Sequence, residues 1–270
     1  MSLADAFLLI AAAFGAGVMN SIAGGGTFLT LPMLIFTGVP AKIANATSTV
    51  ALWPGSVASA IGYLPELKAQ RGRRALFAIS FVGGLLGALL LLATGESTFR
   101  LLIPWLLLVA TVLFAAGPAI TRRLRKDAQS VPDLGRLTAA TAVSQFAIAV
   151  YGGYFGAGIG ILMLAALALS GMDDLHAMNG LKNGLATAIN GIAVITFVAM
   201  DLLPLASMMP WLKNDDVLWW PQVFVMMLAA IAGGLVGVKL ARVLPTRVTR
   251  TVITTIGTVL TVAFFYKTYA

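Results

Sequence analysis

The sequence predicts an all-α polytopic membrane protein built as two inverted repeats. Of its 270 residues, 59% are hydrophobic and 10% are charged, whereas about 25% of residues are charged in an ordinary soluble domain. The mean hydropathy is +0.94. Such a chain lacks the polar surface that a folded domain needs in water. This composition excludes soluble enzymes, DNA-binding domains and disordered linkers.

Long runs without charge define the membrane segments. A spanning helix needs about 20 apolar residues. Two of the runs would each extend about 54 Å as a single helix, well beyond the ~30 Å of membrane hydrocarbon, so each must break. The resulting total is about 8–10 membrane segments. The uncharged runs are Ala6–Ala41, Ile43–Pro65, Ala75–Gly95, Leu101–Thr121, Leu137–Met172, Asn183–Met200, Val217–Val238 and Thr251–Tyr266, of which the first and the fifth are the overlong ones.

Glycine-rich segments mark both breaks. One lies within Asn20–Thr27 and the other within Gly152–Gly160. Glycine this dense weakens a helix, and unwound backbone survives at membrane depth only against protein or a watery cavity. Each broken segment either re-enters the membrane or crosses it fully, and both alternatives stay open.

The two halves of the chain repeat one another. Gly83–Gly87 matches Gly233–Gly237, and Arg100 matches Arg250 at the same offset. Nearer the start of each half, Gly38 and Ala44 match Gly171 and Ala177 at a second, shorter offset, and the polar insert Asp201–Asp216 accounts for most of the difference. We therefore predict a first membrane repeat over residues 1–120, a basic cytoplasmic linker over 121–136 and a second repeat over 137–270.

Charge distribution predicts the topology. Inverted halves place more of the Lys and Arg residues on one side of the membrane than parallel halves do, so the positive-inside rule favours inversion with both termini outside. No signal peptide is expected from the first residues. The net charge of +8 lies in short loops, which suits anionic lipid rather than nucleic acid.

Residue usage limits the chemistry. The chain has no Cys and one His, which argues against thiolate or multi-histidine metal sites, and no set of catalytic side chains is recognisable. We expect no enzyme activity, no cofactor and no metal.

The glycine breaks predict an anion site. A helix N-terminus offers free N–H groups and a partial positive charge, and two such starts facing each other would bind an anion. The candidate residues are Gly24, Gly25, Gly26 and Thr27 in the first half and Gly156, Gly158 and Gly160 in the second. The alternative is tight packing of small residues. For Gly83, Gly87, Gly233 and Gly237, which have no polar neighbours, packing is the interpretation we favour.

Polar side chains follow each break. Asn45, Thr47 and Ser48 do so in the first half, and Asn179, Lys182 and Asn183 in the second; Thr187 and Asn190 continue the face of Asn179 and Asn183. These side chains either bind an anion or hydrogen-bond between helices. Lys182 would complement an anion, unless it snorkels to the interface. His176 is either a proton relay or an interfacial loop residue.

The residues resemble a known family. Gly24–Leu34, Gly38–Pro40 and Ala44–Ser48 look like the signature of the sulfite exporter TauE/SafE family, of the toluene sulfonate uptake permease superfamily, and Tyr154–Gly160 resembles its second glycine motif. The sequence departs from the pattern at Ala165, where the first motif has Pro32, and at Asn179–Asn183, which replaces a Thr-Ser run.

The resemblance implies a transporter of the bacterial inner membrane for sulfur-containing oxyanions. We expect a secondary transporter that moves a small anion, most readily sulfite or an organosulfonate, by alternating access between the repeats. A proton or Na⁺ would be the coupling ion, and a homodimer is one oligomeric state left open. The alternatives are a passive anion channel and a membrane assembly or sensor subunit without transport.

Overall fold

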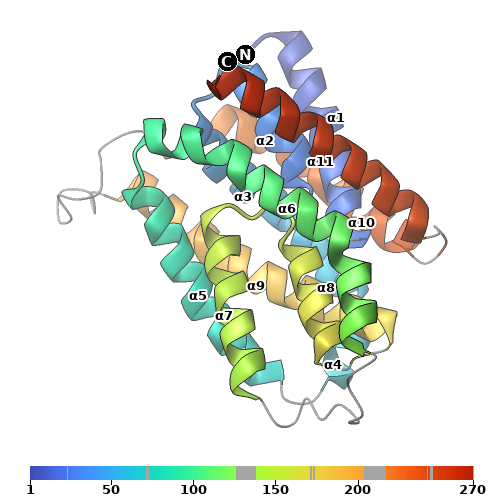
Figure 1. The fold of residues 1–270 in the computed structure, drawn as a ribbon. Coiled ribbons are helices and arrows are strands. Elements are labelled where there is room, and N and C mark those ends of the chain that lie inside the picture. The colour runs from blue at the N-terminus through green and yellow to red at the C-terminus, as the bar shows by residue number, and fades with distance from the viewer. Residues whose placement is uncertain are drawn as a thin grey trace.

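A computed structural model describes residues 1–22, 24–70, 73–125, 138–170, 172, 174–203, 217–241, 243 and 246–269. These residues form helices and contain no strand (Figure 1). The longer helices are α1 (Leu3–Ile22), α3 (Ala41–Gly62), α5 (Arg73–Ala93), α6 (Glu96–Arg125), α9 (Leu175–Leu202), α10 (Trp220–Ala241) and α11 (Thr246–Tyr269). The shorter ones are α2 (Thr27–Phe36), α4 (Leu64–Ala69), α7 (Ala139–Tyr154) and α8 (Ile159–Leu169).

Four of the described helices are long and apolar enough to cross a membrane. They are α1, most of α5, most of α9, and α10. The apolar helices α2 and α8 have 10 and 11 residues, about half the length of a full span. The prediction of an all-α membrane protein is confirmed, while the total of membrane segments and the inversion of the repeats stay predictions.

Both overlong runs break where glycine is dense. α1 ends at Ile22 and α2 begins at Thr27, while α7 ends at Tyr154 and α8 begins at Ile159. The connections need left-handed backbone: φ is +84° and +93° at Gly24 and Gly25, and +77° at Gly156 and Gly158. L-residues with a side chain rarely adopt such angles. Glycine at these positions therefore ends one helix and starts the next within a few residues.

The main helix pairs are preserved when the two halves are exchanged. α1 packs on α10 as α7 packs on α5, and α3 packs on α10 as α9 packs on α5. Likewise α6 contacts α8 as α11 contacts α2, and the equivalent pairs α3–α9 and α6–α11 pack on each other. Figure 1 shows α6 (green) and α11 (red) along one face of the molecule and α9 near its middle. Each broken helix thus packs mainly against the opposite half of the chain.

Close helix contacts explain the glycines of the repeat motif. A Cβ atom on Gly87 would lie 2.1 Å from the Val150 carbonyl oxygen, and one on Gly233 would lie 2.1 Å from that of Phe14. Gly83 and Gly237 are also in contact with the opposite half, with nearest atoms at 2.7 and 2.8 Å. Our interpretation of these four residues as packing residues agrees with this geometry.

Two predicted connections are described only in part. α6 continues as helix to Arg125, so it includes the start of the predicted linker, and residues 126–136 of that linker lie outside the described residues. The polar insert Asp201–Asp216 is described only for its first three residues.

Candidate anion-binding site

The two glycine breaks lie against each other. A Cβ atom on Gly24 would be 2.8 Å from the Gly160 Cα atom, and one on Gly25 would be 3.9 Å from the Gly158 nitrogen. Gly24 precedes α2 and Gly160 lies in the first turn of α8. The starts of the two short helices therefore meet.

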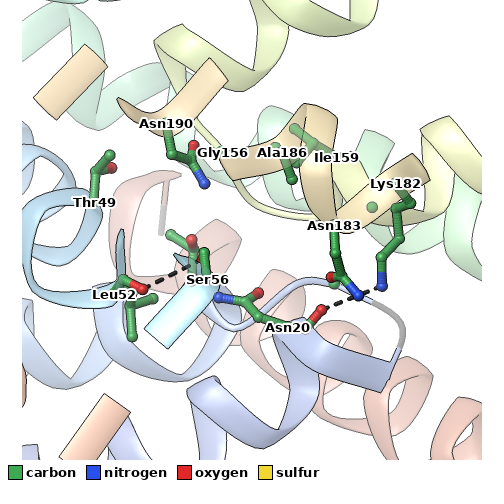
Figure 2. Close-up of a pocket in the computed structure, with 13 residues that line it drawn as sticks. Asn20, Thr49, Leu52, Ser56, Gly156, Ile159, Lys182, Asn183, Ala186 and Asn190 are labelled. Atoms are coloured by element: carbon green, nitrogen blue, oxygen red, sulfur yellow. Dashed lines mark hydrogen bonds between the residues drawn. The ribbon is translucent and has the colours of Figure 1, made fainter. Parts of the chain in front are cut away.

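A small buried pocket lies at this meeting point (Figure 2). Its volume is about 30 Å³, enough for a few water-sized particles in this conformation. Both breaks, α3 and α9 contribute to its wall. The lining residues are Asn20, Gly24, Thr27, Thr49, Leu52, Ser56, Gly156, Ile159, Gly160, Lys182, Asn183, Ala186 and Asn190.

Lys182 brings a cation to the pocket. Its side chain is 1% exposed, which contradicts the snorkelling alternative, because the ammonium stays inside the protein. Its Nζ atom donates to the carbonyl oxygens of Asn20 at 3.2 Å and Ser21 at 3.4 Å; Figure 2 shows the first of these bonds. Both carbonyls belong to the last turn of α1, where the helix dipole is negative. Lys182 therefore ties α9 to the end of α1.

Amide side chains share the pocket with the Lys182 ammonium. The Asn183 Nδ2 atom donates to the same Ser21 carbonyl at 3.4 Å. Asn20 spans the first break, since its Oδ1 atom accepts the Gly26 N–H at 2.7 Å. Asn190 lies two turns beyond Asn183, and its buried Oδ1 atom has no hydrogen-bond partner. These groups are polar and neutral.

Hydroxyl side chains complete the pocket wall. The Thr49 Oγ1 atom donates to the Asn45 carbonyl at 2.9 Å, and the Ser56 Oγ atom donates to that of Leu52 at 3.3 Å. Thr49 corresponds to Lys182 at the offset that relates Gly38 to Gly171, and Thr27 corresponds to Gly160. Two pairs of equivalent positions therefore line one pocket, between the two repeats.

Six of the predicted site residues line the pocket, namely Gly24, Thr27, Gly156, Gly160, Lys182 and Asn183. Gly25, Gly26 and Gly158 lie in the breaks beside them. Asn179 is 7% exposed and lies one turn before Asn183, outside the pocket lining, and its buried Oδ1 atom has no hydrogen-bond partner. His176 is exposed near the start of α9, where its N–H bonds the capping Asp174 Oδ1 atom at 2.9 Å.

Three predicted side chains on α3 form bonds elsewhere. The Asn45 Nδ2 atom donates to the carbonyl of Tyr154, the last residue of α7, at 3.0 Å. The Thr47 Oγ1 atom accepts the Trp219 N–H at 3.1 Å, and the Ser48 and Thr30 hydroxyls bond each other at 2.6 Å. These contacts fit the interhelical alternative for Asn45, Thr47 and Ser48.

Sequence reasoning left several lining residues out of the predicted site. Thr49 and Asn190 carried a usable signal, since each is polar and close to a candidate on the same helix. Asn20 is the last amide before the first glycines. Leu52, Ser56, Ile159 and Ala186 carried no distinctive signal, and only the packing of α3 and α8 against α9 brings them together.

The pocket is lined by hydrogen-bonding groups, and its described lining contains no Asp, Glu or His side chain. The described residues contain no group of three or more His, Asp or Glu side chains that could hold a metal ion. The pocket instead offers the Lys182 side chain, amide N–H groups, the Thr27 hydroxyl and two helix starts. Such donors stabilise negative charge.

A buried polar pocket between two broken helices, in a chain with membrane-length apolar helices, defines a membrane transporter. Residues 9–264 match the family described as "Sulfite exporter TauE/SafE". The chain belongs to the sulfite exporter TauE/SafE family, as its motifs suggested. Its relatives are named as transporters in the same general terms.

One relative is a "Probable membrane transporter protein" of Haemophilus influenzae, 30% identical over 86% of this chain and 84% of the relative. Another is "Probable membrane transporter protein YfcA" of Escherichia coli K12, 23% identical over 94% of this chain and 87% of that protein. No solved structure is significantly similar to the chain.

Proposed function

We propose that this protein is a secondary transporter that moves a small anion, sulfite or an organosulfonate, across the bacterial inner membrane. The observation that carries the proposal is the buried ammonium of Lys182 at the pocket where the two breaks meet. The sulfur oxyanion class comes from the family, and the anion preference comes from the pocket.

Charge is the first argument. A buried cation costs several kcal/mol unless it is paired. The bonded partners of Lys182 are two neutral carbonyls, so its charged form is only partly balanced. An anion in the pocket would supply the missing opposite charge. This imbalance is the reason to expect affinity for anions.

Donor geometry is the second argument. An ammonium has three N–H donors, and the two carbonyl bonds leave Lys182 one for a substrate oxygen. The Asn183 Nδ2 atom likewise retains a second N–H beyond its bond to Ser21. With the Thr27 hydroxyl and the starts of α2 and α8, these groups would surround an oxyanion.

Alternating access is the mechanism we propose. The pocket is small in this conformation, so an organosulfonate requires the two halves to separate around it. Equivalent packing of the halves supports a motion in which either side can open. A proton or sodium gradient would drive the cycle.

The test is anion binding to the purified protein. Thermal shift would be read with sulfite, sulfate, sulfoacetate, a longer sulfonate, acetate and phosphate. In sodium-free buffer we expect selective stabilisation by a sulfur oxyanion, lost in Lys182→Ala. The matched control is Lys239→Ala, which removes an exposed Lys on α10 outside the pocket. Stabilisation that survives Lys182→Ala would remove Lys182 from the site.

Flux in proteoliposomes separates transport from the alternatives. We expect saturable uptake of the stabilising anion. Currents without saturation would instead indicate a passive channel, and binding without flux an assembly or sensor subunit.

We further propose inverted repeats with both termini outside. Cysteines introduced at Lys68 and Lys239 would then react with an impermeant reagent from the same, cytoplasmic side. Labelling from opposite sides would require parallel repeats. The absence of native cysteines makes each label specific.

A further inference from the structure

We propose that the Lys182 ammonium occupies the cation site of this transporter in place of a coupling sodium ion, and that anion binding and transport are therefore independent of sodium. The inference rests on the proposed anion transport and narrows its driving force to gradients other than sodium.

The position of the ammonium is that of a cation site. The carbonyls of Asn20 and Ser21 close α1, which ends at Ile22, and the last carbonyls of a helix lack partners within it. Carbonyl oxygens at the C-terminal ends of broken helices bind Na⁺ in transporters of this architecture. Here both oxygens lie 3.2 and 3.4 Å from Nζ.

The ammonium matches sodium in charge but not in mobility. Both are monovalent cations that oxygen atoms bind. Lys182 is fixed to α9 by its own chain, so it cannot enter from one side of the membrane and leave on the other. A tethered cation can attract the anion in every cycle, but it carries no gradient energy. Sodium is then excluded from the carbonyls of Asn20 and Ser21.

The other break supports one cation site rather than two. The Tyr154 carbonyl at the end of α7 accepts the neutral Asn45 amide at 3.0 Å. The pocket residue equivalent to Lys182 is the neutral Thr49. Among the described residues, the pocket lining therefore has one cation, on α9.

The experiment compares two ways of removing the charge. Lys182→Ala removes the side chain beyond Cβ and opens space beside the carbonyls of Asn20 and Ser21. Lys182→Met removes the charge and fills most of that space. Purified full-length proteins would be heated in sodium gluconate and in N-methyl-D-glucamine gluconate, and sulfite binding would be titrated in both salts.

The expected pattern differs between the variants. Wild type should have the same melting temperature and sulfite affinity in both salts. Lys182→Ala should gain roughly 2–4 °C in sodium, and its sulfite affinity should rise at least about tenfold there, a change that corresponds to about 1.4 kcal/mol. Lys182→Met should not respond to sodium.

Three results would overturn the inference. One is sodium-dependent sulfite binding by wild type. Another is a Lys182→Ala protein that is folded but indifferent to sodium. The third is an equal sodium response in Lys182→Met. If Lys182→Ala does not fold, Lys182→Thr can replace it, because it also removes the ammonium from the two carbonyls. The comparison of wild type in the two salts needs no variant.

The two proposals fail differently. If wild type binds no sulfur oxyanion, the proposed function fails. The thermal response of Lys182→Ala to sodium alone still tests whether the carbonyls form a cation site.

Discussion

Ser21 and Tyr154 hold equivalent positions at the ends of α1 and α7, and the carbonyl of each accepts a bond from a helix of the other half. The donors differ. Ser21 receives the Lys182 ammonium and the Asn183 amide, whereas Tyr154 receives the Asn45 amide. One scaffold, used twice, thus carries charge at one break and a neutral bond at the other.

The two breaks also differ in the space around their left-handed glycines. A Cβ atom on Gly24 would be 2.8 Å from the Gly160 Cα atom. On Gly156 it would meet its nearest atom, the Gly152 carbonyl oxygen, at 3.4 Å, an ordinary contact. The comparison teaches that the two halves share their helix packing, whereas the residues that differ between them determine the charge and the space in the pocket.

The largest expected effect tests the difference in space. Gly24→Ala adds backbone strain of about 1–2 kcal/mol and a backbone clash of roughly 1–3 kcal/mol. Gly156→Ala adds only the strain. We expect Gly24→Ala to lower the melting temperature about twice as much as Gly156→Ala, measured on purified protein in detergent. Equal losses would show that the breaks are equally tight.

The second prediction tests the difference in charge. In sodium-free buffer, Lys182→Thr should weaken sulfite binding roughly 100-fold, because the bound anion would then lie in a buried site without a charged partner. Adding Thr49→Lys returns a cation to the same pocket from the equivalent position. Titration of the double variant should give an affinity within about tenfold of wild type. If the double variant folds but binds sulfite as weakly as Lys182→Thr, the cation must be on α9 and not on α3.

The smallest effect concerns the neutral bonds. The Ser21 carbonyl accepts from two side chains, so Asn183→Ala leaves it bonded to Lys182. Asn45→Ala removes the amide that bonds Tyr154 and should cost about 1–3 kcal/mol. We expect the loss for Asn183→Ala to be below about 1 kcal/mol. Thermal unfolding of both variants measures this order, and the reverse order would contradict the asymmetry.

Much of the fold could be predicted from the sequence, because membrane helices appear as long runs of residues without charge. The two overlong runs predicted both breaks, and glycine density placed them within a few residues of where α1 and α7 end. α4 went unpredicted because its six residues, which include Pro65, give no clear periodic signal.

The site was only partly predictable. Lys182 was identifiable because a charge in an apolar helix is costly. Its burial depends on the end of α1, far away in sequence, so only the structure could show that the side chain does not reach the surface. Its role in substrate binding stays a prediction. Asn45 and Thr47 look like binding residues in sequence. Only the structure shows that Asn45 donates to the carbonyl at the end of α7 and that Thr47 accepts the Trp219 N–H.

The exchanged packing of the halves has a consequence for biogenesis. α1 emerges from the ribosome well before α10, whose glycines it packs against. Until α10 is synthesised, the face of α1 that packs on it is exposed to lipid. A first half made alone should therefore be a target for membrane proteases, and the two halves co-expressed as separate chains should protect each other.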